Sequence, residues 1–175
     1  MKRGILSLVS ICISLLIFCA YADDNHQLSN SSVKIPALEY KNSRAVENKR
    51  ISGKNYIGGK SSSYNKQGVA TAGKALMPYA SYDIAAKLAG GTYTVTVYYS
   101  IDKDKAPNNP YIYLEMDFLG DQKINVDKKN LVNSVKASFN TKILKDKKHS
   151  VKIWLPCQGV RIEKFEVRRA IISKK

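Results

Sequence analysis

The stretch from residue 92 to residue 99 alternates strictly between two faces. One face would carry Tyr93, Val95, Val97 and Tyr99, and the other Thr92, Thr94, Thr96 and Tyr98. A period of two is the pattern of a strand with one buried face, and β-branched and aromatic residues suit a pleated sheet. The pattern therefore predicts a central strand, with Tyr93 and Tyr99 in the hydrophobic core.

Two glycines, Gly90 and Gly91, precede this strand, and glycine readily adopts the positive φ angles of tight turns. The run before them, Ser81–Leu88, has the composition of another strand. We therefore expect these two strands to form a hairpin.

Further short strands are expected on both sides of this hairpin. The candidates are Val33–Tyr40, a short strand within Ile51–Gly68, Val69–Pro78, Tyr111–Phe118, Gln122–Val126, Val135–Thr141, His149–Leu155 and Val160–Val167. Pro36 favours an edge position for the first, and a slip in the apolar phase between Ile162 and Phe165 predicts a β-bulge in the last. About eight to ten strands without a long helix predict an all-β fold, an antiparallel β-sandwich or jelly roll, over residues 33–170.

The first 22 residues have the features of a secretory signal peptide. Basic residues follow Met1, an apolar run extends from Ile5 to Ala20, and small residues stand at Ala20 and Ala22. We expect cleavage after Ala22 and a secreted or periplasmic bacterial protein without a membrane span; a retained anchor is the alternative. Residues 23–32 read as a disordered lead-in and residues 171–175 as a basic tail.

The chain has a formal net charge of +15, which falls to about +13 when Lys2 and Arg3 leave with the signal peptide. A positive charge of this size attracts polyanions, including anionic polysaccharides, although scattered lysines also suit an ordinary solvated surface. No segment concentrates them as a specific nucleic-acid site would. Cys157 would be the one cysteine of the mature chain, which excludes an internal disulfide and suits a buried small side chain.

The residues do not favour an enzyme. His26 and His149 are the two histidines and lie far apart in the chain, so neither a zinc site nor a catalytic triad is indicated. Glu115 and Asp117 would share one strand face, where salt bridges to lysines are the usual explanation. Among the aromatic residues, Trp154 should face away from Val151 and Ile153 and is a candidate for stacking on a sugar.

The order of several segments resembles a known fold. These are the strand with Glu39, the Gly/Ser-rich loop, the run Ala89–Val97, and the closing pair His149–Leu155 and Gly159–Val167. Together they resemble the galactose-binding-domain-like jelly rolls, and among them the non-catalytic carbohydrate-binding modules of families 6 and 35. The resemblance implies that Tyr56 or Tyr64 stacks on a sugar, that Gln158 supplies an amide, and that a structural calcium uses Glu39 and Glu166.

The residues and the resemblance together lead to one expectation and one alternative. The expectation is a secreted, non-catalytic, lectin-like module that binds carbohydrate through loop aromatics. The alternative is a basic cell-surface or host-directed interaction protein, such as an adhesin, that binds an anionic partner.

Overall fold

The computed structural model describes residues 32–71, 73–84, 91–117, 120–129, 132–141 and 149–169. The expected signal peptide, almost all of the expected lead-in and the expected basic tail lie outside these ranges. Within them, no helix is long and apolar enough to cross a membrane.

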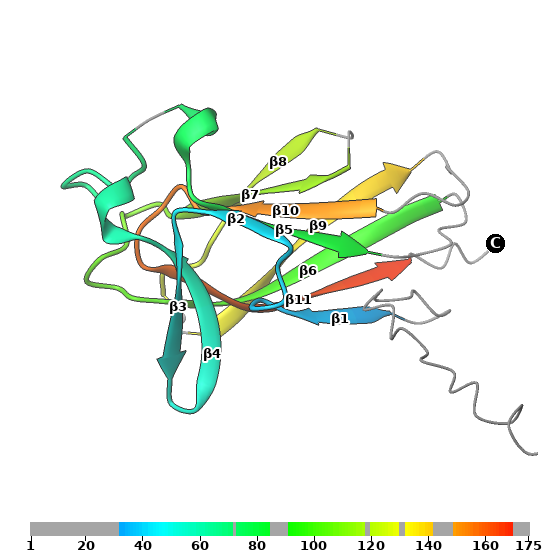
Figure 1. Cartoon of the computed structure of the whole chain (residues 1–175), viewed down its shortest axis with the longest axis horizontal. Coiled ribbons are helices and arrows are strands. Elements are labelled where there is room, and N and C mark those ends of the chain that lie inside the picture. Colours follow the sequence, from blue (N-terminus) through cyan, green and yellow to red (C-terminus); the bar gives the residue numbers. More distant parts are fainter. Residues whose placement is uncertain are drawn as a thin grey trace, which may run out of the picture.

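Eleven described strands form two antiparallel sheets, which make the two layers of a sandwich (Figure 1). The strands are β1 (Val33–Pro36), β2 (Asn42–Arg44), β3 (Val46–Ile51), β4 (Lys54–Gly59), β5 (Tyr79–Ile84), β6 (Gly91–Ile101), β7 (Tyr111–Met116), β8 (Asp121–Asn125), β9 (Val132–Thr141), β10 (His149–Trp154) and β11 (Val160–Arg169). One sheet has the order β3-β4-β11-β6-β9, with β1 also paired to β11, and is called the six-stranded sheet. The five-stranded sheet has the order β2-β5-β10-β7-β8. The predicted all-β sandwich is therefore confirmed.

The core lies between the sheets and is built from the inward positions of alternating strands. In β6, Tyr93 and Tyr99 are at most 2% exposed, as the alternation predicts. The ring of Tyr82 in β5 meets the ring of Phe165 in β11 edge-on, with centroids 4.7 Å apart. The Tyr82 hydroxyl donates a hydrogen bond to the carbonyl of Ala37 at 2.8 Å. Tyr82 therefore connects the two layers by both packing and a buried polar contact.

The predicted bulge is confirmed in β11. Ile162 pairs with Tyr99 of β6 and Lys164 pairs with Tyr98, so Glu163 has no opposite residue. On its other edge, β11 pairs with β4 before the bulge and with β1 after it. The Glu163 carbonyl accepts a hydrogen bond from Ala37 at 3.0 Å, where β1 ends. Among the described strands β1 pairs with β11 alone, as its proline predicts.

The expected hairpin between residues 81–88 and the central strand is wrong. β5 pairs with β2 and β10, whereas β6 pairs with β9 and β11, so the two strands belong to different sheets. Both strands have a strongly apolar face, and these faces are buried against the same core from opposite layers. The residues 85–90 that would form the turn lie outside the described ranges.

Residues 41–50, which are charged and expected to form a helical turn or a loop, instead hold β2 and most of β3. Their hydrophobic alternation is weak, because β2 is exposed at all three positions and β3 has no fully buried residue. Figure 1 shows the β3–β4 hairpin projecting past the neighbouring strands. In the stretch Val69–Pro78, expected as an edge strand, the described residues form isolated bridges and the short 3-10 helix Lys74–Leu76.

We predict that Tyr82→Phe lowers the free energy of unfolding by about 1–2 kcal/mol, because the Ala37 carbonyl loses its buried donor. Tyr82→Ala should cost about 3–5 kcal/mol, because the contact with Phe165 is lost as well. Tyr79→Phe, on the outer face of the same strand, is the matched control and should stay within about 0.5 kcal/mol. Urea denaturation measures all three, and equal losses at positions 79 and 82 would contradict the assignment.

Candidate functional site

Three aromatic residues form a row across the outer face of the five-stranded sheet. Tyr79 of β5 pairs in register with Trp154 of β10, which pairs with Tyr113 of β7. Arg44 of β2 and Lys123 of β8 extend the same row at its two ends. Neighbouring strands lie about 4.8 Å apart, so the three rings are spread over about 10 Å. We call Tyr79, Trp154 and Tyr113 the aromatic row.

Trp154 is the centre of this row and faces away from the core, as its strand position predicts. Its ring centroid lies 5.0 Å from that of Tyr79, and its indole N–H donates to Glu115 at 3.2 Å. The ammonium groups of Lys74 and Lys152 lie 5.1 and 4.8 Å from its ring centroid, within the range of cation–π attraction. Trp154 is only 6% exposed.

Lys74 reaches the tryptophan from the short helix that follows the Gly/Ser-rich segment. Its ammonium group pairs with Asp121 at 3.0 Å and with Glu115 at 3.5 Å. The row is thus bordered by carboxylates and ammonium groups that can hydrogen-bond to the hydroxyls of a ligand.

The two tyrosines predicted from the Gly/Ser-rich loop are held by the fold in different ways and do not join the aromatic row. Tyr56 lies in β4 and is 4% exposed, so its expected place in a flexible loop is wrong. Tyr64 is partly buried, and its hydroxyl donates to the Leu155 carbonyl at 2.9 Å. Burial raises the pKa of Tyr64 well above its usual value. The Tyr64 hydroxyl lies where a Cβ of Gly59 would stand, so that glycine is needed for this packing.

Gln158 lies in the turn before β11, as predicted, but not beside the aromatic row. Its backbone N–H donates to the Gly68 carbonyl at 2.7 Å. Its neighbours Ser61 and Lys105 help to line a depression with room for about 10 Å³, close to the volume that one water needs. Among the described residues, the depression beside Gln158 is therefore smaller than a sugar.

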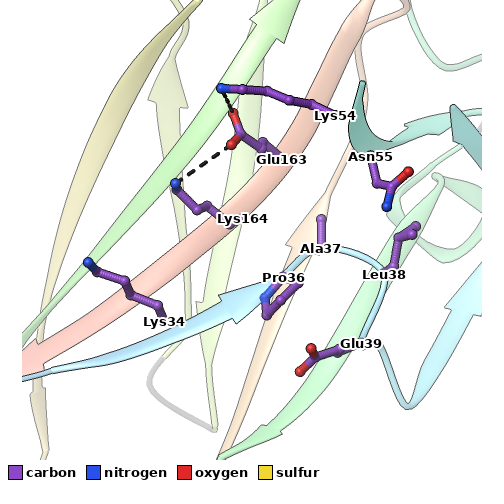
Figure 2. Close-up of a pocket in the computed structure, with 9 residues that line it drawn as sticks. All are labelled: Lys34, Pro36, Ala37, Leu38, Glu39, Lys54, Asn55, Glu163 and Lys164. Atoms are coloured by element: carbon purple, nitrogen blue, oxygen red, sulfur yellow. Dashed lines mark hydrogen bonds and ion pairs between the residues drawn. The ribbon is translucent and has the colours of Figure 1, made fainter. Parts of the chain in front are cut away.

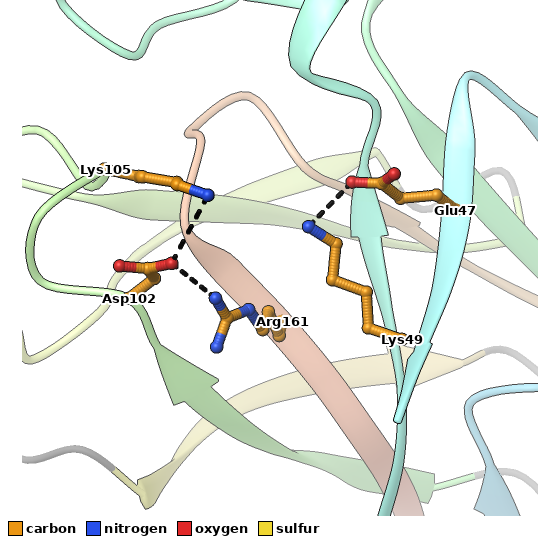
Figure 3. Close-up of polar contacts among 5 residues, drawn as sticks. All are labelled: Glu47, Lys49, Asp102, Lys105 and Arg161. Atoms are coloured by element: carbon orange, nitrogen blue, oxygen red, sulfur yellow. Dashed lines mark hydrogen bonds and ion pairs between the residues drawn. The ribbon is translucent and has the colours of Figure 1, made fainter. Parts of the chain in front are cut away.

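Ion pairs hold the loops at this end in place (Figure 3). Asp102, in the loop after β6, pairs with Arg161 of β11 at 2.5 Å and with Lys105 at 3.9 Å. Lys49 of β3 pairs with Glu47 at 2.8 Å. These charges serve as partners for one another, so this end does not present a uniform cationic surface.

A cavity that includes the predicted residue Glu39 lies between β1 and β4 (Figure 2). Its volume is about 510 Å³, and its lining consists of Lys34, Pro36, Ala37, Leu38, Glu39, Lys54, Asn55, Glu163 and Lys164. Glu163 pairs there with Lys54 at 3.3 Å and with Lys164 at 3.6 Å. We call this cavity the β1–β4 pocket.

Glu39 lines the same pocket as Glu163, whereas Glu166 is not among its lining residues. Glu166 instead contacts Arg168 at 3.1 Å and Tyr98 at 3.3 Å. A hydrogen bond from Ser32 and the nearby Arg168 lower the pKa of Glu166. Calcium takes six to eight oxygen ligands, whereas Glu166 already has a guanidinium beside it. The described residues contain no group of three or more potential metal-ligating side chains, so the surroundings of Glu166 do not fit the predicted calcium site.

The sequence did not reveal a buried histidine–aspartate pair. Asp117, expected to share a face with Glu115, has a positive φ of 50° and turns toward His149. Its carboxylate lies 2.5 Å from the His149 ring and also accepts the Ser150 N–H at 2.6 Å.

Cys157 is fully buried, and burial raises the pKa of its thiol, which is the opposite of what a nucleophile needs.

We predict that Gly59→Ala destabilises the protein by about 1–3 kcal/mol, because the new methyl group displaces the Tyr64 ring. Gly58→Ala is the matched control, since a Cβ there meets no atom closer than 3.7 Å. Thermal unfolding measures the stability of both variants. The cost of Gly59→Ala should largely disappear in a Tyr64→Ala background, and an undiminished cost would contradict the contact.

No family model and no curated protein sequence matches the chain. Several solved structures match it in fold. The C-terminal family 6 carbohydrate-binding module of LamC from Zobellia galactanivorans matches with TM-score 0.55 and 15% identity, over 79% of this chain and 99% of that one. A family 35 carbohydrate-binding module from Clostridium thermocellum matches with TM-score 0.54 and 13% identity, over 80% of this chain and 99% of that one.

Enzymes that contain such modules match in part. A Podospora anserina β-(1,4)-mannanase with a family 35 module gives TM-score 0.58 at 8% identity, over 83% of this chain but only 29% of the enzyme chain. At such identities the likeness concerns the fold. The chain therefore has a galactose-binding-domain-like β-sandwich fold, and carbohydrate-binding modules are among its structural neighbours.

Proposed function

We propose that this protein binds carbohydrate without chemically converting it, and that the aromatic row is the binding surface. The observation that carries the proposal is the register that brings Tyr79, Trp154 and Tyr113 side by side on one outer face. The apolar C–H face of a sugar packs on an aromatic ring, while a few polar groups fix its orientation. An elongated row suits an oligosaccharide better than a single sugar.

The polar groups for orientation are already at the row. Glu115 accepts the indole N–H of Trp154, and Lys152 lies over the Trp154 and Tyr79 rings. In the complex, a sugar ring displaces the Lys152 side chain from the tryptophan face and takes a hydrogen bond from its ammonium group. The fold supports this proposal because its structural neighbours include carbohydrate-binding modules, one of them in a complex with cellotriose.

A second candidate function follows from the cations on the same rings. Arg44, Lys74, Lys123 and Lys152 each lie within 5.4 Å of an aromatic centroid on this sheet. An anionic polysaccharide or an anionic host-surface partner could use these charges rather than the rings.

Either function suits a secreted or periplasmic protein, and we propose that the chain is exported and cleaved after Ala22. N-terminal sequencing of the exported protein tests the cleavage position.

We predict that Tyr113→Ala and Trp154→Ala weaken binding to a neutral oligosaccharide on the order of tenfold, as expected for central interface aromatics. Tyr98→Ala removes a half-buried ring from the outer face of the opposite sheet and is the matched control. A glycan array with neutral oligosaccharides selects the ligand, and calorimetry measures the affinities. Full affinity in both row variants, or an equal loss in the control, would refute the site.

The dependence of the binding affinity on salt concentration distinguishes the two candidate functions. Screening lengths shorten from about 8 Å at 0.15 M salt to about 3 Å at 1 M. Stacking on a neutral sugar should therefore keep its affinity within about twofold, whereas binding through charge should weaken by more than about tenfold. A steep salt dependence with every bound glycan would favour the anionic partner.

A further inference from the structure

The β1–β4 pocket exists because β11 changes its neighbour at the bulge. Arg161 and Ile162 pair with β4, and the residues after Glu163 pair with β1. β1 ends at Pro36 as the projecting β3–β4 hairpin begins to diverge, and the space between them measures about 510 Å³. Pockets that hold small ligands commonly measure about 300–1,000 Å³. The pocket lies in the six-stranded sheet, whereas the aromatic row lies on the five-stranded sheet.

The lining of this pocket combines four kinds of groups. Ammonium groups come from Lys34, Lys54 and Lys164, and carboxylates come from Glu39 and Glu163. Asn55 adds an amide, and the backbone bend at residues 36–38 adds apolar surface. Figure 2 shows Lys54, Glu163 and Lys164 on one side of Pro36 and Ala37, and Glu39 on the other.

The Glu163 carboxylate, on which two of these ammonium groups converge, is only partly exposed. The Glu163 side chain is 16% exposed and accepts ion pairs on both carboxylate oxygens, one from Lys54 and one from Lys164. The lysine side chains remain 56% and 41% exposed, so their ammonium groups can also reach a ligand. The pocket therefore presents preformed positive charge around a fixed carboxylate.

This combination selects among ligand classes. A simple inorganic anion would be repelled by the two carboxylates, and a divalent cation would meet three ammonium groups. A neutral sugar would hydrogen-bond to the carboxylates and the ammonium groups but would bring no charge to balance the three lysines. An acidic sugar suits the side of the pocket around Glu163, because its hydroxyls donate to Glu163 while its own carboxylate accepts from the lysines.

We propose that the β1–β4 pocket binds an acidic sugar unit, such as a uronate, through Lys54, Lys164 and Asn55. This site goes beyond the proposed function, because it is separate from the aromatic row and does not require it. A protein with both sites would bind a glycan that carries neutral and acidic units, or two different glycans.

The test uses digalacturonic acid as the probe and its dimethyl ester as the matched ligand, which keeps every hydroxyl and removes both charges. In amide NMR spectra, the acid should shift the Asn55 side-chain signal and the Ala37 backbone signal. The ester should bind at least about tenfold more weakly, because hydrogen bonds between charged groups are lost. Absence of shifts at both positions, or equal binding of the ester, would overturn the proposal.

Variants separate this pocket from the general positive charge. Lys54→Met and, independently, Lys164→Met should weaken digalacturonate binding by about tenfold. Lys103→Met removes the same charge from an exposed position in the loop after β6, outside the pocket, and should change the affinity less than about twofold. Melting temperatures confirm that each variant is folded. Equal effects of all three variants would mean attraction by net charge and would overturn the site.

The aromatic row is monitored in the same titrations. Trp154 is the one tryptophan of the chain, so its indole N–H gives a single signal. Titration of the wild-type protein with a neutral oligosaccharide should move this signal and leave Asn55 unchanged. If the aromatic row does not bind the neutral oligosaccharide, the Trp154 signal will not shift. If the pocket does not bind digalacturonic acid, the Asn55 signal will not shift.

Discussion

The structure depends on the register of β11 more than on any other single feature. This strand pairs with β6 along its whole length and with two strands, β4 and β1, along its other edge. The extra residue at Glu163 makes this possible, because the bulge separates the two pairings and turns the Glu163 side chain toward Lys54. The same irregularity thus completes the six-stranded sheet and opens the β1–β4 pocket. Across the core, Phe165 of β11 packs on Tyr82, which ties this register to the five-stranded sheet.

Much of the fold could be predicted from hydrophobic alternation. The central strand, its buried tyrosines and the bulge near Ile162 all follow from which positions are apolar, because a period of two assigns each side chain to a face. The partners of each strand could not be predicted in this way. β5 and β6 have equally apolar faces and stand close in sequence, yet they face each other across the core instead of pairing. Alternation determines what is buried but not which strand lies alongside.

The candidate site was predictable only in part, again for a physical reason. Strand phase gives the outward direction of Trp154, but the aromatic row also needs Tyr79 and Tyr113, which reach it through pairing between distant segments. The glycines near Tyr64 suggested a flexible loop, whereas Gly59 makes room for the Tyr64 ring against the backbone. A shift of three residues along β11 separates Glu166, which the resemblance indicated, from Glu163, which shares a pocket with Glu39.

The central claim is that the outer face of the five-stranded sheet binds carbohydrate. The most direct test is to map amide and indole NMR shifts during titration with a neutral oligosaccharide chosen by array. We predict that the largest shifts occur at Trp154 and at the backbone of Tyr79 and Tyr113. Shifts confined to the loop end around Gln158 would contradict this account and place the binding surface at the edge of the sandwich.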